Sequence, residues 1–266
     1  MVPSAWPPAE VASMDDVLFE ATDGVAVITI NRPSVKNAVN RRTAEGIAAA
    51  IDRLEGSAEL RIGILTGAGG AFCAGMDLKA FLAGEIPKVE GRGFAGLTEA
   101  LPSKPLIAAV EGYALAGGFE LALACDLIVA ARNARFGLPE VKRGLVARAG
   151  GLMRLPRQMA PRRALELLLT GDFIGAEDAY ATGLINRIAE PGEALALALE
   201  LARTIAANGP LAVAATLQVF RRQADWPSTE IFARQAEFTD PVFVSEDARE
   251  GAAAFAERRA PRWRGR

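Results

Sequence analysis

Apolar segments with the character of strands alternate with segments of helical spacing as far as residue 192, and then stop. Short apolar runs bounded by turn residues predict buried strands at 25–30, 61–66, 106–110, 126–130 and 184–188. Helical spacing of apolar residues predicts helices over 41–55, 117–125 and 161–169. Because strands that alternate with helices build α/β domains, we expect an α/β body.

The remainder of the chain shows helical spacing only, which predicts helices near 193–207, 210–223, 228–238 and 245–258. We therefore divide the chain into an N-terminal tail, a body and a helical C-terminal region, at 1–13, 14–200 and 201–266. The tail has neither a basic region nor an apolar stretch typical of a signal peptide, and we expect it to be mobile.

The charge balance argues against a polyanionic partner. Among 266 residues, 30 Lys and Arg face 32 Asp and Glu, for a net charge of −2. Such a balance gives no global field to attract nucleic acid or an anionic membrane, so we expect neither as a partner. The longest apolar run, 105–125, is interrupted by Glu111, Glu120 and glycines, and is too polar for a membrane span.

Histidine is absent, which excludes Ser-His-Asp and Cys-His catalysis, HExxH zinc sites and His-ligated haem. Acid–base chemistry near neutral pH then depends on carboxylates, Lys, Cys, Tyr or backbone dipoles. The two cysteines, Cys73 and Cys125, are too few for a zinc site or a disulfide framework. We expect no metal, and a reducing, cytoplasmic location.

Two glycine-containing turns precede predicted helices. The segment AFCAGMDL at 71–78 leads from a strand into a helix, where unpaired N–H groups face incoming negative charge. Its alternative interpretation is a tight connecting turn without a ligand. At 111–121, Gly117 and Gly118 allow the backbone to approach a ligand closely, and Glu120 follows among apolar residues. Glu120 is either paired, exposed at an edge, or buried for a chemical purpose.

A third segment, FGLPEVKRGL at 136–145, carries a second glutamate. Pro139 fixes the backbone before Glu140, and the alternative is a simple ion pair with Lys142 or Arg143. Two glutamates in apolar surroundings can handle one water molecule, and backbone N–H groups can bind an oxyanion. The combination suits chemistry beside a carbonyl that becomes an enolate.

These segments resemble the crotonase (enoyl-CoA hydratase/isomerase) superfamily from about residue 16 to residue 266. The resemblance rests on AFCAGMDLKA, PLIAAVEGYALAGGFELALACDLIVA and ARFGLPEVKRGLVARAGGLMRLPR, and on the spacing of 20 residues between Glu120 and Glu140. Within the superfamily, GRGFAGLTE at 91–99 and SEDAREGAAAFAERRAPRWRGR at 245–266 are most similar to crotonobetainyl-CoA (carnitinyl-CoA) hydratases.

The resemblance implies a spiral of ββα units followed by a helical trimerisation region. It implies an oxyanion hole from the N–H groups of Met76 and Gly117, and catalytic roles for Glu120 and Glu140. It also implies contacts with the substrate's coenzyme A, which needs no further cofactor, from Lys36, Ala38, Ala74, Met76, Asp77, Leu78, Lys79 and Gly117, and from Phe255 and Arg258 of a neighbouring subunit.

The implied reaction is reversible addition of water to the 2,3 double bond of an acyl-CoA. By resemblance Glu140 supplies the proton to C2 and Glu120 accepts one from water, although the residues alone leave the two roles open. Double-bond isomerisation on the same scaffold is an alternative. Another is a CoA- or RNA-binding protein without catalysis, suggested by arginines at 258–266.

The same resemblance implies a homotrimer or a dimer of trimers. The helices after residue 192 carry apolar faces, for example Leu195, Leu199, Ala202 and Ile205, that we expect to pack on a neighbour.

Overall fold

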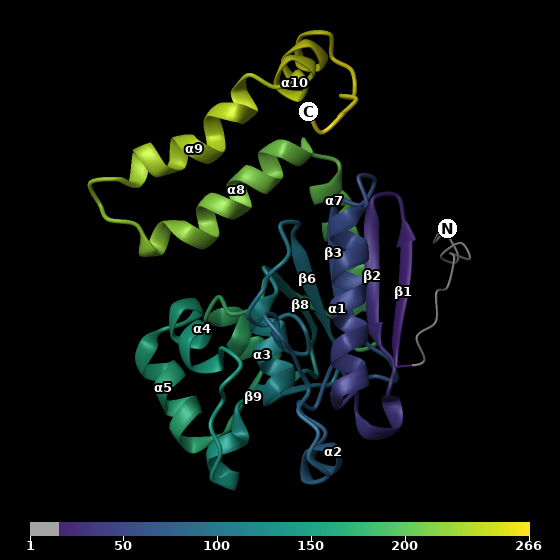
Figure 1. The fold of residues 1–266 in the computed structure, drawn as a ribbon, viewed down its shortest axis with the longest axis vertical. Helices are drawn as coiled ribbons and strands as arrows, with labels where there is room; N and C mark the ends of the chain where they lie inside the picture. The colour runs from purple at the N-terminus through teal and green to yellow at the C-terminus, as the bar shows by residue number, and fades with distance from the viewer. Residues whose placement is uncertain (1–15) are drawn as a thin grey trace.

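The computed structural model describes residues 16–266, so the predicted tail at 1–13 lies outside the described residues. A six-stranded sheet forms the centre of the molecule (Figure 1). Its strands, in spatial order, are β1 (Val17–Thr22), β2 (Val25–Ile30), β3 (Ile62–Gly67), β6 (Leu106–Val110), β8 (Leu127–Ala131) and β11 (Arg187–Ala189). Strand β1 is antiparallel to β2 and the remaining neighbours are parallel, as the predicted α/β body requires.

Two smaller sheets complete the strand arrangement. One contains β10 (Phe173–Gly175), β9 (Arg135–Gly137) and β7 (Tyr113–Leu115), and the other pairs β4 (Lys88–Val89) with β5 (Gly93–Phe94). The helices are α1 (Arg41–Gly56), α2 (Leu78–Leu82), α3 (Gly117–Ala124), α4 (Gly151–Gln158), α5 (Pro161–Thr170), α6 (Ala176–Ala181), α7 (Ala194–Ala206), α8 (Pro210–Arg222), α9 (Ile231–Phe243) and α10 (Glu246–Ala256). Three 3₁₀ turns are η1 (Pro33–Val35), η2 (Pro139–Arg143) and η3 (Gln223–Asp225).

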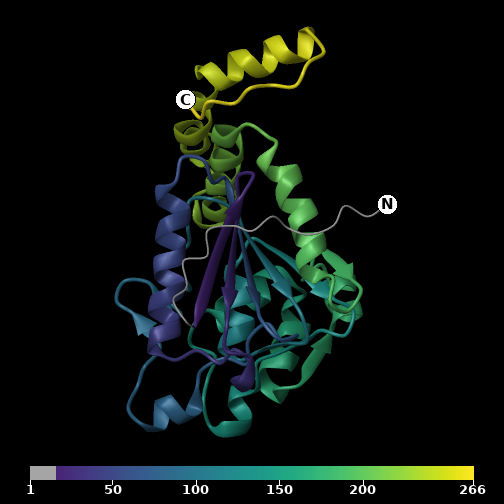
Figure 2. The same cartoon turned by 90° about the vertical axis from the view of Figure 1, so that its right-hand side faces the viewer.

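The central strands β2, β3, β6 and β8 are apolar apart from Thr29 and Thr66, because both faces of the sheet are buried. In β2, Val25 and Val27 face α7, whereas Ala26 and Ile28 join the larger core that also contains α1 and α3. Figure 2 shows the sheet nearly edge-on, with α1 on one side and α7 on the other. Helix α3, which bears Glu120, therefore packs on the face of the sheet that belongs to the larger core.

The C-terminal helices divide at the end of α7. The apolar face of α7 packs on its own sheet, so the expectation that Leu195, Leu199, Ala202 and Ile205 face a neighbour is wrong. Helices α8, α9 and α10 instead extend away from the sheet (Figures 1 and 2). Their exposed aromatic side chains are Phe220, Phe232, Phe243 and Phe255. The predicted boundary between the body (14–200) and the C-terminal region (201–266) falls within α7, and this boundary stays a prediction.

Several elements differ from their predictions. Strand β1 was not expected, although Asp23 and Gly24 supply the two-residue turn with positive φ that joins it to β2. The predicted strand at 184–188 forms only as β11, because Leu184 and Ile185 are core side chains that precede it. Helix α4 was also missed. None of the helices within 16–266 is long and apolar enough to cross a bilayer.

Candidate functional site

The turn around Met76 is held from both sides by backbone hydrogen bonds. The N–H of Val39 donates to the carbonyl of Gly75 at 2.8 Å, and the N–H of Asp77 donates to the carbonyl of Val39 at 2.9 Å. Gly75 has a φ of +94°, which L side chains rarely adopt. The Asp77 carboxylate caps α2 by accepting from the N–H of Lys79 at 3.1 Å. The sequence therefore fixes the direction of the Met76 peptide.

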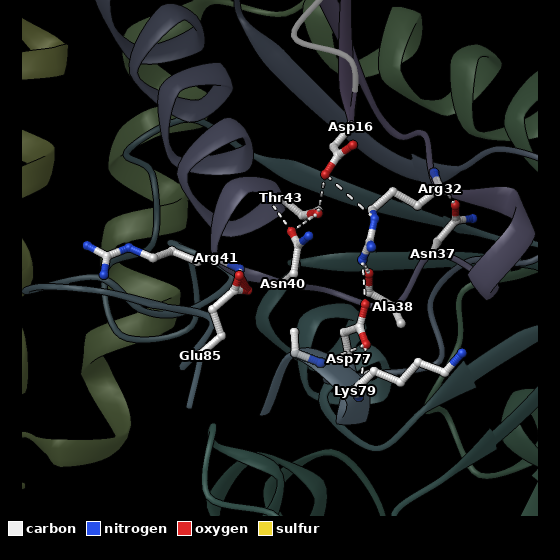
Figure 3. A network of polar contacts seen from close by, with 12 residues as sticks. Asp16, Arg32, Asn37, Ala38, Asn40, Arg41, Thr43, Asp77, Lys79 and Glu85 are labelled. Carbon is white, nitrogen blue, oxygen red and sulfur yellow. Dashed lines mark hydrogen bonds and ion pairs between the residues drawn. The ribbon is translucent and has the colours of Figure 1, made fainter. Parts of the chain in front are cut away.

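A partly buried arginine that the sequence analysis did not identify braces this turn. The guanidinium of Arg32 lies 3.1 Å from the Asp77 carboxylate and 3.6 Å from that of Asp16, and it donates to the carbonyl of Ala38 (Figure 3). The pKa of Asp77 is lowered, because backbone donors and Arg32 outweigh the effect of its burial. The network ties the predicted CoA-binding residues at 36–38 to those at 74–79.

The predicted CoA contacts at 36–38 and 74–79 lie on chain segments that are joined to each other. The N–H of Ala74 donates to the carbonyl of Lys36 at 3.0 Å, which joins the two chain segments. The Lys36 ammonium lies 5.0 Å from the centroid of the Tyr113 ring. Leu78 and Lys79 are exposed beside them. Lys36 and Lys79 therefore carry two exposed ammonium groups on segments that this hydrogen bond joins.

The start of α3 meets the Met76 turn. A Cβ added to Gly75 would lie 3.0 Å from the Gly117 nitrogen, so the two turns are in contact. Ala116 has a φ of 51° and a ψ of −128°, a strained backbone conformation for a residue with a Cβ. Among residues 16–266, neither the N–H of Met76 nor that of Gly117 donates to a protein acceptor. The pair is available to bind an oxyanion, as the resemblance implies.

An aromatic side chain lies against this pair. A Cβ added to Gly117 would lie 2.6 Å from the tip of the Phe94 ring. The segment 82–96 contains the β4–β5 hairpin, and Arg92 ties it to α1 by donating to the Ala48 carbonyl at 2.9 Å. Phe94 is thus a residue of the site that composition alone did not reveal.

Glu120 is buried, with 3% of its surface exposed, and it makes no ion pair within 4 Å among the described residues. Its Oε1 accepts hydrogen bonds from the N–H groups of Ala149 at 2.7 Å and Gly151 at 2.9 Å. Burial raises its pKa, while these two donors and the charge of Arg154 act in the opposite direction. The paired and edge alternatives are therefore wrong for Glu120.

Glu140 stands in η2, and its Oε2 is buried with no hydrogen-bond partner among residues 16–266. The ion-pair alternative is wrong, because Lys142 pairs with Asp172 at 2.8 Å and Arg143 donates to the Pro139 carbonyl. Burial, and then the charge of Glu120, raise the pKa of Glu140 to about 7. The charge of Glu120 therefore acts on the carboxyl group of Glu140.

Two predicted residues lie far from this site in the single chain. Phe255, which is 87% exposed, belongs to α10, and Arg258 follows it, whereas α2 lies at the opposite end of the molecule (Figure 1). This placement agrees with their expected contact with a neighbouring subunit's ligand and does not test it. Residues 16–266 hold no group of three or more His, Cys, Asp or Glu side chains arranged for a metal ion.

Comparison with known proteins gives the context for this geometry. Residues 20–266 match the enoyl-CoA hydratase/isomerase family. The chain is 44% identical over 247 residues to the carnitinyl-CoA dehydratase of Salmonella typhi, covering 90% of this chain and 94% of that protein. It is 43% identical over 265 residues to enoyl-CoA hydratase EchA19 of Mycobacterium tuberculosis, covering 97% and 100% of the two chains.

The fold agrees with solved structures as well. The crystal structure of an enoyl-CoA hydratase from Mycobacterium tuberculosis H37Rv superimposes with a TM-score of 0.93 at 59% identity, covering 94% of this chain and 99% of that one. The predicted crotonase-like architecture with a helical C-terminal region is therefore confirmed. The chain belongs to the enoyl-CoA hydratase/isomerase family.

Proposed function

We propose that this protein is an enoyl-CoA hydratase, which adds water reversibly to the 2,3 double bond of an acyl-CoA thioester. The observation that carries the proposal is the pairing of Glu120 and Glu140 beside two unused N–H donors. Oε1 of Glu120 is held by two N–H donors, and Glu140 keeps a buried oxygen free, which suits two groups that share one water molecule.

The N–H groups of Met76 and Gly117 bind the thioester oxygen. When water adds at C3, the electron pair of the double bond moves toward the thioester and its oxygen gains enolate charge. Each preorganised donor then contributes roughly 10²–10³-fold to the rate, because its hydrogen bond strengthens as the charge develops. The strained Ala116 and the positive φ of Gly75 aim the two donors.

The two glutamates complete the proton transfers. Glu120 accepts a proton from water as the C3–O bond forms, and Glu140 donates a proton to C2. Return of a proton from Glu120 to Glu140 then restores both groups, so that one water molecule is consumed. The raised pKa of Glu140, about 7, keeps its proton available near neutral pH. In the dehydration direction the same groups exchange roles.

Coenzyme A is part of the substrate, and we propose no other cofactor and no metal. Its phosphates are bound by Lys36 and Lys79, beside the backbone of Ala38 and Ala74. A cytoplasmic location is part of the proposal, since Cys73 and Cys125 are buried free thiols that form no disulfide. Ion pairs of Arg259 with Glu250, and of Arg264 and Arg266 with Glu246, favour the enzyme over an RNA-binding alternative.

The exposed phenylalanines of α8–α10 support a homotrimer or a dimer of trimers. Phe255 and Arg258 would then complete a neighbour's CoA site. Removing 245–266 is expected to lower the mass in sedimentation and raise KM together. A Phe255→Ala/Arg258→Met double variant is expected to raise KM with the mass unchanged. A deletion that leaves both mass and KM unchanged contradicts this part of the proposal.

A panel of acyl-CoA substrates tests the reaction itself. Loss of the absorbance of the conjugated thioester is followed with crotonyl-CoA, and formation of that absorbance with a 3-enoyl-CoA. Turnover of crotonyl-CoA but not of the 3-enoyl-CoA supports hydration, and the reverse result assigns an isomerase. Because relatives are named carnitinyl-CoA dehydratase, crotonobetainyl-CoA belongs in the panel, and a higher kcat/KM for it identifies the substrate. Absence of turnover with all three overturns the proposal.

A further inference from the structure

A half-buried arginine in α4 joins two turns that border the site. The guanidinium of Arg154 donates to the carbonyl of Ala149 at 3.2 Å and to the carbonyl of Thr98 at 2.7 Å. Ala149 and Thr98 belong to segments about fifty residues apart in the sequence. The planar fork of an arginine suits this role, because it holds two acceptors in fixed directions.

The first of these turns holds Glu120. Ala149 donates its N–H to Glu120 Oε1 at 2.7 Å, while its carbonyl accepts from Arg154. Gly150 lies between Ala149 and the second donor, Gly151, and has a φ of +112°. A Cβ on Gly150 would lie 2.0 Å from the guanidinium, so the glycine is needed for Arg154 to reach this position.

The second turn carries the side chain that covers Gly117. Thr98 donates its N–H to the carbonyl of Phe94 at 3.3 Å, which closes the turn from 94 to 98. The Phe94 ring lies against Gly117, one of the two proposed oxyanion donors. Through Thr98 and Ala149, one guanidinium therefore links the oxyanion side of the site to the glutamate side.

We infer that Arg154 is a positioning residue for Glu120, which holds the 149–151 turn and the 94–98 turn in fixed relation across the site. The inference rests on the proposed hydration reaction and adds a residue that touches no substrate. Its effect is transmitted through Ala149 to the carboxylate and through Phe94 to Gly117.

Charges from several elements act on Glu120. Arg154 of α4 favours its ionised form, and Glu140 of η2, with Arg143 beside it, opposes a second negative charge. Behind Arg154 lie Arg221 and the buried Cys125 thiol, whose pKa is raised and which stays neutral. Loss of the Arg154 charge is therefore expected to raise the pKa of Glu120, with the other charges unchanged.

The test compares Arg154→Met, Arg154→Lys and a matched control, Arg157→Met, on the same helix. Arg157 is exposed, and within residues 16–266 its ion pair is with the exposed Asp225 at 3.4 Å. Hydration of crotonyl-CoA is measured from pH 5 to pH 9, with melting temperature and kcat and KM recorded separately. The wild-type rate tests the proposed function, whereas the differences among variants test Arg154.

We expect Arg154→Met to lower kcat by about tenfold or more, with little change in KM, because Glu120 is displaced while the CoA contacts remain. The acidic limb of its profile is expected to move to higher pH by roughly one unit. Arg154→Lys should keep that limb near its wild-type position but lose kcat severalfold, because an ammonium cannot hold both carbonyls in the same geometry. Arg157→Met should behave as wild type.

The lysine variant keeps the inference testable if the methionine variant does not fold. A folded Arg154→Lys protein with wild-type kcat overturns the inference, as does a folded Arg154→Met protein with an unchanged kcat and pH profile. A wild-type enzyme that fails to hydrate any substrate of the panel contradicts the proposed function instead.

Discussion

Glu120 of α3 and Glu140 of η2 carry carboxyl groups in opposite hydrogen-bonding surroundings. Around Glu120, the backbone of 149–151 supplies two N–H donors to one oxygen. Around Glu140, the η2 turn leaves one buried oxygen without a partner, and its cationic neighbours are engaged elsewhere. Both carboxyl groups are largely withdrawn from solvent, so hydrogen bonding makes the difference between them.

This difference separates their chemistry. Donors to an ionised carboxylate stabilise the charged form, whereas burial without donors stabilises the neutral form. Burial raises the pKa of both groups, but at Glu120 two backbone donors and the charge of Arg154 oppose that rise. In the proposed mechanism this difference suits Glu120 to accept a proton and Glu140 to hold one near neutral pH.

The largest expected effect comes from removing either carboxyl group. Glu120→Gln and Glu140→Gln keep the side-chain shape but cannot exchange a proton, so kcat for hydration should fall by roughly 10²–10⁴-fold in each. Affinity for the substrate's CoA portion should stay near that of wild type, because neither glutamate lies with Lys36 or Lys79. Steady-state hydration assays measure kcat, and a competitive CoA-binding assay measures the affinity.

The same substitution at the exposed Glu166 supplies the control and should leave kcat unchanged. If both Gln variants of the site retain more than about a tenth of the wild-type rate, the two-glutamate mechanism does not operate in this chain.

A smaller effect is expected at the oxyanion hole. Gly117→Pro deletes the N–H at the first position of α3, where proline is otherwise tolerated, and should lower kcat by roughly 10²–10³-fold. Gly117→Ala is the matched control, because it keeps the N–H while its Cβ, like that of proline, meets the Phe94 ring. Gly118→Ala is unsuitable, since its Cβ would lie 2.1 Å from the Cys73 carbonyl oxygen.

Melting curves establish that both Gly117 variants are folded. Equal kcat in the proline and alanine proteins would remove the Gly117 N–H from the site and leave Met76 as the sole proposed backbone donor.

Local patterns were sufficient for much of the fold and for the chemistry-bearing segments. The apolar runs of β2, β3, β6 and β8 are visible because both faces of the sheet are buried, and Asp77 is readable as the cap of α2. The short strands β7, β9 and β10 have no period of their own, since each spans three residues and exists only through its partners. Tertiary pairing decides such elements.

The supporting residues of the site were beyond sequence reasoning for a related reason. Arg32 and Arg154 look like ordinary arginines in the chain, and their importance comes from acceptors that folding brings to them. Likewise, the face of α7 looked unpartnered because its own sheet, formed by residues far upstream, is invisible to a local pattern. Phe94 becomes a site residue only when the hairpin places it on Gly117.

The pH dependence of hydration sharpens the contrast between the glutamates. Glu140, with a pKa of about 7, loses its proton above that pH, so kcat/KM should fall by about tenfold per pH unit on the alkaline side if it is the acid. In Glu120→Gln the neighbouring negative charge is gone, and the alkaline limb of the residual rate should move to lower pH. A rate that instead rises with pH through 7 reverses the two roles.

The smallest expected effect is on the free energy of unfolding, which reports on the protonation of Glu140 without any turnover. Its pKa is raised in the folded state to about 7 from an ordinary 4.5, so the folded protein binds this proton more tightly than the unfolded chain does. The stabilisation that this tighter binding gives the folded protein is fully present below the unfolded pKa of 4.5. It is lost as the pH rises through about 7. Glu140→Gln, which is neutral throughout, should therefore gain unfolding free energy relative to wild type between pH 5 and pH 8. After allowance for partial solvent screening the gain is about 1 kcal/mol.

Urea unfolding at pH 5 and at pH 8, at one protein concentration and with Glu166→Gln as control, measures this gain. A difference that does not change with pH would mean that the solvent reaches Glu140 as freely in the folded protein as in the unfolded chain.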